Sequence, residues 1–474
     1  MDIFDPIRRV AASAWETAEE LVNEERLHLA VTGLSRAGKT VFITSLVENL
    51  LGLAGGRDTL PKFRAALEHQ GESRLRGVRL VPAGAGALPR FDHAAHVAAL
   101  ARADAAWPER TGDLAQLSIA IELERRSTVG RVLGPRRIRL DLLDYPGEWL
   151  LDLPLLGQDF GTWSRTTLAR LRKGARAEAC RPFLEWLVGF RPGATADEAV
   201  LRRGHALYRA GLEACRSTLG LRYLQPGRFL NPGPQAEVPF MWFFPAEGEA
   251  GPGSGAALLS ERYDAYRRHM RAAFFDTHFR AFDRQVLLVD VLGALHAGRA
   301  AFEDTAEAIA DLCRGLHGAP EWWERLLPWG AGSPIARVAV VATKADHVPA
   351  LRRDALRHLL AALAAPALEG RDGPVRGGAV SLHVAAAVTA TRDAKARLGG
   401  RDVEVVEGVV LGEDRARPYF VGDVPPGWPP DGFWGGEYFE LPTFRPPRIA
   451  VGQGVGVPHL GLDEILVALL GDRL

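Results

Sequence analysis

The stretch Gly33-Leu34-Ser35-Arg36-Ala37-Gly38-Lys39-Thr40 decides the fold, because it fits the phosphate-loop pattern G-x-x-x-x-G-K-[ST]. Residues 26–32 before it form a short apolar stretch that predicts a strand, and residues 40–51 after it carry apolar residues at helical spacing. A strand, a glycine loop and a helix in this order point several backbone N–H groups and a helix N-terminus at one anion. The pattern therefore predicts a site for nucleotide phosphates.

Each residue type in this loop suits the chemistry of a phosphate site. Gly33 and Gly38 allow the chain to wrap the phosphates without Cβ clashes. Lys39 is expected to reach the outer phosphates, and the Thr40 hydroxyl is expected to ligate Mg²⁺. The other predicted phosphate-binding residues of the loop are Ser35, Arg36 and Ala37.

A second motif concerns the metal ion and the terminal phosphate. Residues 137–147 predict a strand that runs into D-x-x-G, with Asp144 and Gly147 at the two motif positions. An Asp at the carboxyl end of such a strand holds Mg²⁺ through a water molecule, and the Gly N–H binds the γ-phosphate. Loss of that bond on hydrolysis frees the following segment, which makes the segment a switch. Asp141 and Asp290 are alternatives, but only Asp144 has a glycine three residues on.

A third motif predicts which base is bound. Residues 338–346 form an apolar strand that ends in T-K-x-D, with Thr343, Lys344 and Asp346 as the base-binding residues. The Asp346 carboxylate can accept hydrogen bonds from the N1–H and the 2-amino group of guanine. Adenine has neither donor, so an unpaired buried carboxylate rejects it. Alone, T-K-A-D also fits a helix start, but its place after two ordered motifs predicts GTP and GDP as ligands.

Two further candidates rest on similarity to known GTPases. Residues 383–391 resemble the exit loop of the last sheet strand in heterotrimeric G-protein α subunits, which implies that the Ala387 N–H contacts the guanine O6. Thr111 lies where many GTPases place the first-switch threonine that joins the Mg²⁺ shell. Ser127 and Thr128, in the turn after the next predicted strand, are the alternatives to Thr111.

The catalytic candidates are Glu148, Arg36 and Arg110. Glu148 follows D-x-x-G, where Ras-like proteins carry a glutamine that orients the attacking water. A carboxylate can accept a proton from that water, but the γ-phosphate repels its charge, so hydrolysis is expected to be slow unless a cation offsets it. Arg36 and Arg110 are two such cations; alternatively they only line the rim or pair with Glu148, and an external partner activates hydrolysis.

Composition limits the classes of function. Lys plus Arg number 58 and Asp plus Glu number 58, so no net field favours nucleic acid or an anionic membrane. Three widely separated cysteines indicate a reduced compartment, and the thirteen histidines show no zinc spacing. No apolar run approaches the length of a membrane span, and the N-terminus lacks the apolar core of a signal peptide. We expect a cytoplasmic protein, peripheral at the inner membrane only through a partner.

The 474 residues are too many for one compact core. The basic run at residues 165–176 is expected to be a solvated helix face, with a phospholipid or partner site as the alternative. The expected divisions begin with an N-terminal helix at 1–25 packing on the core and the first part of a G domain at 26–165, with an insertion of helical character at about 53–106. A helical insertion at 166–280 and the second part of the G domain at 281–400 follow. An extension at 401–474 ends in a terminal helix at 462–470.

Five segments together resemble the YcjX family of bacterial stress-associated P-loop GTPases, which is often linked to the phage-shock response. They are residues 33–40, 107–114, 142–156, 284–290 and 343–346. The resemblance implies an α/β P-loop NTPase fold with a Ras- or Gα-like, doubly wound, mostly parallel sheet, a largely helical insertion and a C-terminal β/loop extension.

The implied activity is Mg²⁺-dependent hydrolysis of GTP to GDP and phosphate by a conformational switch acting in a stress response. The resemblance also implies a protein partner, with a membrane protein among the candidates, and no nucleic acid is expected. One alternative is a GTP-gated binding module with negligible hydrolysis. The other is an ATPase or small-molecule kinase, against which Asp346 argues.

Overall fold

The computed structural model describes residues 24–34, 36–68, 73–82, 88–109, 114–127, 134–232, 236–317, 335–368, 379–435, 441–450 and 455–474. The N-terminal helix expected within residues 1–25 falls almost entirely outside these ranges, as do Ser35, Arg110, Thr111 and Thr128. Among the described residues, no helix combines the length and the apolar character needed to cross a bilayer.

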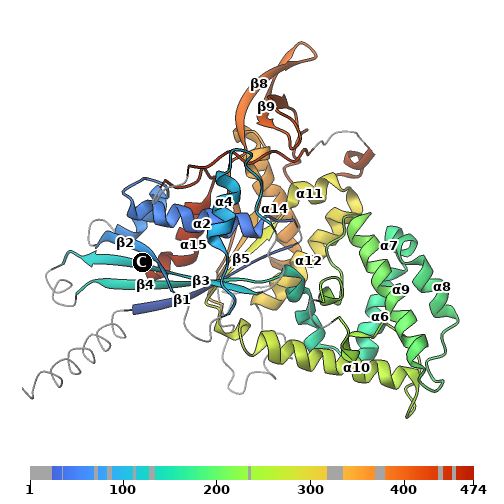
Figure 1. The fold of residues 1–474 in the computed structure, drawn as a ribbon. Helices are drawn as coiled ribbons and strands as arrows, with labels where there is room; N and C mark the ends of the chain where they lie inside the picture. Colours follow the sequence, from blue (N-terminus) through green and yellow to red (C-terminus); the bar gives the residue numbers. More distant parts are fainter. Residues whose placement is uncertain are drawn as a thin grey trace, which may run out of the picture.

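A seven-stranded sheet in the order β2-β3-β4-β1-β5-β6-β7 forms the centre of the fold (Figure 1). All its neighbouring strands pair in parallel except β3, which runs antiparallel to both β2 and β4. This confirms the expected mixed α/β fold with a mostly parallel sheet. The strands are β1 (Glu24–Gly33), β2 (Ser73–Val81), β3 (Ala115–Arg125), β4 (Arg136–Asp144), β5 (Arg284–Val289), β6 (Arg337–Ala342) and β7 (Ala379–Val384).

Helices cover both faces of the parallel part of the sheet, which is why β5 is buried at every position. The helices α2 (Lys39–Ala54), α3 (Pro61–Glu68) and α15 (Leu462–Leu470) share one apolar cluster with alternate residues of the strands. The helices α11 (Val291–His296), α12 (Arg299–His317) and α14 (Arg353–Leu368) belong to the cluster on the other face. The terminal helix α15 begins and ends at the residues predicted from its sequence.

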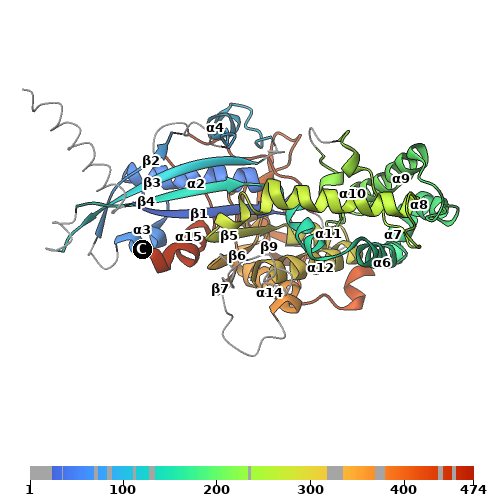
Figure 2. The same ribbon diagram turned by 90° about the horizontal axis from the view of Figure 1, so that it is seen from below.

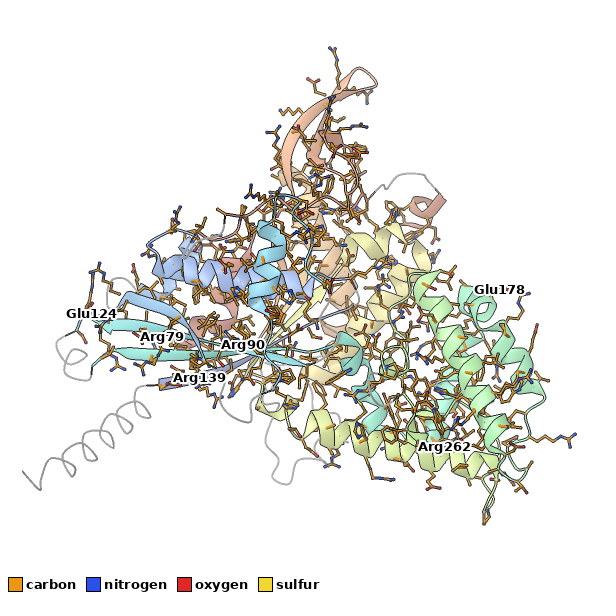
Figure 3. All side chains as sticks on the ribbon, viewed as in Figure 1. Arg79, Arg90, Glu124, Arg139, Glu178 and Arg262 are labelled. Atoms are coloured by element: carbon orange, nitrogen blue, oxygen red, sulfur yellow. The ribbon has the colours of Figure 1, made fainter. Side chains whose placement is uncertain are left out.

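Edge strand β2 was not expected, because its region was predicted to be helical. Its pairing with β3 shifts register between Leu75 and Gly77, so the apolar residues of β2 do not alternate strictly. The face of β2–β4 opposite α2 and α3 carries charged side chains in ion pairs, among them Arg79 with Glu122 and Arg139 with Asp141. Figure 3 shows Arg79 and Arg139 on this wing of the sheet.

A helical segment, residues 158–283, lies between the 3₁₀ helix η2 (Gly147–Gly157) and strand β5. Figures 1 and 2 agree that it lies beside the sheet, not on either face. Aromatic side chains fill its interior, with Trp163 stacked on Tyr263 at 5.0 Å, and Figure 3 shows Arg262 among them and Glu178 at the outer rim. Its helices are α6 (Phe160–Leu171), α7 (Gly174–Ala179), α8 (Arg181–Val188), α9 (Glu198–Ser217) and α10 (Gly255–Met270).

Acidic side chains partner the basic run at residues 165–176. Arg170 lies 2.6 Å from Glu307, and Arg176 forms an ion pair with Asp304; both acids belong to α12. Arg172 lies 3.6 Å from Glu247. The ion pairs of Arg170 and Arg176 therefore link the helical segment to α12, one of the helices that cover the main sheet.

A second, three-stranded antiparallel sheet projects from the body beyond the end of β7 (Figure 1). It consists of β8 (Thr391–Leu398), β9 (Arg401–Val409) and β10 (Ala416–Tyr419). From there the chain returns to the main sheet, where Leu460 exchanges backbone hydrogen bonds with Ala386 at 3.1 and 2.8 Å. The chain's end therefore braces the loop that follows β7.

Candidate nucleotide-binding site

The phosphate-loop sequence forms a backbone loop between β1 and α2. Gly38 caps the N-terminus of α2 in the left-handed conformation, with φ of 80°, which glycine adopts without strain. The exposed residue Arg36 also has a positive φ, of 69°. The N–H of Leu34 donates to the Leu288 carbonyl of β5 at 3.1 Å, and the N–H of Ala37 donates to the Leu34 carbonyl at 3.0 Å. The loop is thus anchored to its neighbouring strand at the start of α2.

Two glycines bring the phosphate loop and the D-x-x-G motif into contact. A Cβ added to Gly147 would lie 2.1 Å from the carbonyl oxygen of Gly33. A Cβ added to Gly33 would lie 2.9 Å from the Leu288 Cβ. Space, and not a positive φ, therefore requires glycine at both positions, and the two motifs meet backbone to backbone.

Lys39 joins the same two motifs through its side chain. Its Nζ lies 2.6 Å from Asp144 Oδ1 and donates to the Tyr145 carbonyl at 2.8 Å. The Asp144 side chain is almost fully buried, and Thr40 is buried in the first turn of α2. A buried carboxylate and a hydroxyl at one edge of the sheet are hard oxygen donors of the kind that Mg²⁺ prefers. These residues fit a Mg²⁺ ion beside bound phosphates.

The alternative aspartates have other partners. Asp290 caps α11 through the N–H of Gly293 at 2.9 Å and lies 2.5 Å from Lys344 Nζ. Asp141 lies on the charged face of the sheet, where burial alone would raise its pKa. Hydrogen bonds from Ser118 and Arg26 outweigh burial and bring the pKa of Asp141 below its usual value.

The T-K-x-D motif lies where β6 ends. Lys344 has a φ of 61° and starts the short 3₁₀ turn that contains Asp346. Asp346 is buried, and its Oδ2 accepts a hydrogen bond from the Ala390 N–H at 2.8 Å, while the Thr391 hydroxyl donates to the Asp346 carbonyl. The loop after β7 therefore holds Asp346 in place.

The same loop touches α2. The Ser45 hydroxyl donates to the Ala387 carbonyl. The predicted base-contacting residues Asp346 and Ala387 thus belong to one connected arrangement, although 40 residues of sequence and strand β7 separate them.

Part of the predicted site lies outside the described residues. Ser35, Arg110 and Thr111 are in this group, so their roles stay predictions. The alternative Ser127 lies beyond the end of β3, whereas the start of β3, Ala115, pairs with Asp144. At about 3.3 Å per residue, the 12 residues from Ala115 to Ser127 place Ser127 far from the phosphate loop. The structure therefore argues against Ser127.

Sequence reasoning missed His96, on helix α4 (His93–Ala101). Its Nε2 is buried and has no hydrogen-bond partner among the described residues. Burial lowers the pKa of His96, and the carboxylates of Asp92 and Asp144 oppose that effect. The next residue, Val97, packs in one cluster with Val41, which follows Thr40. No sequence pattern reveals this proximity, because only the packing of α4 on α2 creates it.

Residues 27–474 match the sequence model of the YcjX-like family, DUF463. The chain belongs to this family. It is 34% identical over 465 residues to a protein of Escherichia coli (strain K12) named Ras-like GTPase YcjX, an alignment that covers 95% of this chain and 96% of the relative. A protein of the same name from Shewanella oneidensis is 32% identical over 470 residues, with 95% of both chains covered. These matches confirm the family resemblance.

The YcjX-like match begins within β1 and runs to the last residue. It therefore includes all three nucleotide motifs, the helical segment, the projecting sheet and α15. The helical segment is thus part of the length that the YcjX-like family shares.

Proposed function

We propose that this protein binds GTP with Mg²⁺ and hydrolyses it to GDP and phosphate, changing conformation as it does so. The observation that carries the proposal is the contact between the phosphate loop and the D-x-x-G motif. Gly147 lies against Gly33, and Lys39 reaches from the loop to Asp144. The names of the two relatives, Ras-like GTPase, agree with this chemistry. A GTPase of this family would use that contact to sense the γ-phosphate.

The residues of the site would have distinct roles. Lys39 and the loop N–H groups would bind the phosphates, and Thr40 with Asp144 would hold Mg²⁺, which supplies positive charge to the β- and γ-phosphate oxygens. A water oxygen attacks the γ-phosphorus, and the bond from that phosphorus to the β,γ-bridging oxygen breaks. The products are GDP, inorganic phosphate and the proton released from the water. The half-buried Glu148 is the chain's candidate to orient that water.

Asp346 would select guanine. The Ala390 N–H bonded to Oδ2 fixes the carboxylate orientation, so the base would meet a preorganised acceptor. Each unmatched buried group costs about 1–3 kcal/mol. The Asp346 carboxylate would therefore make binding of adenine nucleotides weaker than binding of guanine nucleotides.

A GTP-gated binding module with negligible hydrolysis is the second candidate. The observation that favours it is Glu148, whose negative charge is repelled by the γ-phosphate, so that hydrolysis would be slow without a cation to offset it. In either case we propose a protein partner that recognises one nucleotide state, with a membrane protein among the candidates. The stress response that the family resemblance implies is the proposed setting. Comparing the proteins retained by GDP-loaded and non-hydrolysable-GTP-loaded protein tests this part.

Nucleotide selectivity tests the binding proposal. GTP is expected to bind at least tenfold more tightly than ATP, and multiple-turnover assays should release phosphate from GTP faster than from ATP. Asp346→Asn should weaken GTP binding by about 1–3 kcal/mol per lost hydrogen bond and favour xanthosine triphosphate, whose ring carbonyl can pair with the new amide. The control is Asp354→Asn, an identical change at an exposed aspartate. Equal affinity for GTP and ATP in the wild type would contradict the proposal.

A further inference from the structure

The 3₁₀ helix η2 begins at Gly147, and the helical segment binds it along most of its length. Its buried Asp152 accepts hydrogen bonds from the Gly227 N–H at 2.7 Å and the Tyr266 hydroxyl at 2.5 Å. Three more side chains of the helical segment donate to backbone carbonyls of η2, namely Gln225, Tyr263 and Arg267. The chain that follows the D-x-x-G motif is therefore bonded directly to the helical segment.

Trp149, the third residue of η2, contacts two buried side chains of the helical segment. The guanidinium carbon of Arg228 lies over the Trp149 ring, 4.1 Å from its centre. The Phe274 ring packs against it nearly perpendicularly, with 5.1 Å between the ring centres. Arg228 and Phe274 are both buried, and a cation over an indole face is attracted by the negative charge of that face. The helical segment therefore sets the orientation of the Trp149 ring.

Glu148 lies between two residues that are held in place. On one side Gly147 lies against the phosphate loop, where its added Cβ would meet the carbonyl of Gly33. On the other side is Trp149. Glu148 itself is touched by the helical segment, because a Cβ added to Gly227 would lie 2.1 Å from the Glu148 carbonyl oxygen. The backbone from which the Glu148 side chain extends is therefore held on all three residues.

The Trp149 ring is also connected to the phosphate loop. Its neighbour Phe274 packs on Tyr145, with 5.1 Å between the ring centres. The Tyr145 hydroxyl donates to Gln285 of β5 at 3.0 Å, and the Tyr145 carbonyl accepts from Lys39 Nζ at 2.8 Å. The rings that pack around Trp149 thus include the residue whose carbonyl binds the phosphate-loop lysine.

We propose that Arg228 is a positioning residue for GTP hydrolysis, because its stack on Trp149 fixes the backbone of η2 and thereby the placement of Glu148. The inference rests on the proposed GTPase function and on the role of Glu148 in orienting the attacking water. The oxygen of that water bonds to the γ-phosphorus as the bond from phosphorus to the β,γ-bridging oxygen breaks, which gives GDP, phosphate and a proton. A reacting group misplaced by about 1 Å can lose about 10² in rate. The helical segment would therefore affect the chemical step through Trp149.

The test is single-turnover GTP hydrolysis by the full-length protein. Arg228→Ala is expected to slow hydrolysis by about 10- to 100-fold, while the affinities for GDP and for a non-hydrolysable GTP analogue change less than threefold. The backbone N–H of Arg228, which donates to Asp152 at 3.4 Å, is retained in this variant. Arg228→Lys keeps a cation but not the planar guanidinium that stacks on the ring, so it should recover part of the rate.

The matched control is Arg202→Ala. Arg202 stacks on Trp242 at 3.7 Å within the same helical segment, so this variant removes the same kind of contact from a ring that is not part of η2. Its hydrolysis rate is expected to stay within twofold of wild type. Equal rate losses in Arg202→Ala and Arg228→Ala would assign the effect to general loosening of the helical segment and would overturn the inference.

A double-mutant cycle tests whether Arg228 acts through Trp149. Trp149→Leu should slow hydrolysis about as much as Arg228→Ala, and the double variant should be less than threefold slower than the slower single variant, because both changes remove one contact. Additive losses would assign the effect to another route, such as the charge of Arg228 acting on the Asp152 carboxylate, and would overturn the inference. If Arg228→Ala is poorly folded, Arg228→Gln, which keeps much of the stem, takes its place.

The remaining outcomes separate this inference from the proposed function. Hydrolysis within twofold of wild type in Arg228→Ala overturns the inference alone. A wild-type rate in Glu148→Ala contradicts the role of Glu148, and with it the inference, while GTPase activity stands. Wild-type protein that binds GTP without any hydrolysis overturns the inference together with the hydrolytic part of the proposed function.

Discussion

Replacing Asp152 with alanine is expected to destabilise the protein through the bonds between η2 and the helical segment. Asp152 is buried and accepts hydrogen bonds from the Gly227 N–H and the Tyr266 hydroxyl. Alanine leaves both donors buried without that acceptor, at about 1–3 kcal/mol each. We therefore expect the free energy of unfolding to fall by about 2–6 kcal/mol. Asp152→Asn keeps the shape and one acceptor oxygen, so its loss should be smaller.

The same residue gives the stability a pH dependence. Burial raises the pKa of Asp152 from 3.8 to about 6, and hydrogen bonds from Tyr266 and Gly227 oppose that rise. Because the folded pKa is above the unfolded one, the folded state binds more protons between these values. The contribution of Asp152 to stability is therefore largest at low pH and is lost as the pH rises through about 6. Between pH 5 and pH 7.5 this amounts to about 1.4 kcal/mol.

Urea unfolding at pH 5 and pH 7.5, followed by circular dichroism and tryptophan fluorescence, measures both effects. The stability difference between the wild type and Asp152→Asn should shift in favour of Asn by about 1.4 kcal/mol on going to pH 7.5. A difference that is equal at the two pH values would refute the assigned ionisation of Asp152. A loss below about 1 kcal/mol in Asp152→Ala would refute the energetic role of its hydrogen bonds.

Two further comparisons between variants test the site itself. Gly147→Ala places a Cβ 2.1 Å from a phosphate-loop carbonyl, so we expect a loss of about 1–3 kcal/mol in stability and at least tenfold weaker GTP binding. The control is Gly193→Ala, where an added Cβ meets no atom within 4 Å. Equal behaviour of the two variants would contradict the close contact. Asp144→Ala should remove Mg²⁺-dependent turnover, whereas Asp290→Ala should mainly lose a helix cap, about 1 kcal/mol in a melting experiment; the reverse pattern of turnover would make Asp290 the metal partner.

Local patterns predicted the elements whose sequence signal is complete within a short window. The phosphate loop, the D-x-x-G strand and the terminal helix Leu462–Leu470 are of this kind, because glycine spacing and apolar periodicity express their local geometry directly. The edge strand β2 was not predicted, because its register shift near Gly77 breaks the alternation of apolar and polar residues. The strand β8 was not predicted either. Its charged residues, among them Arg392 and Lys395, suit an exposed hairpin and give little apolar periodicity.

The sequence alone determined the chemistry available at the site, since residue types and their order along the chain specify a phosphate loop, a carboxylate at one strand end and another at the T-K-x-D motif. Only the tertiary structure decided which distant groups join that chemistry. His96 comes near Asp144 because α4 packs on α2. Arg228 stacks on Trp149, next to Glu148, because hydrogen bonds to Asp152 hold the helical segment in place. Contacts between residues so far apart in sequence leave no periodic pattern, because they depend on how complete elements pack and not on the local geometry of any one of them.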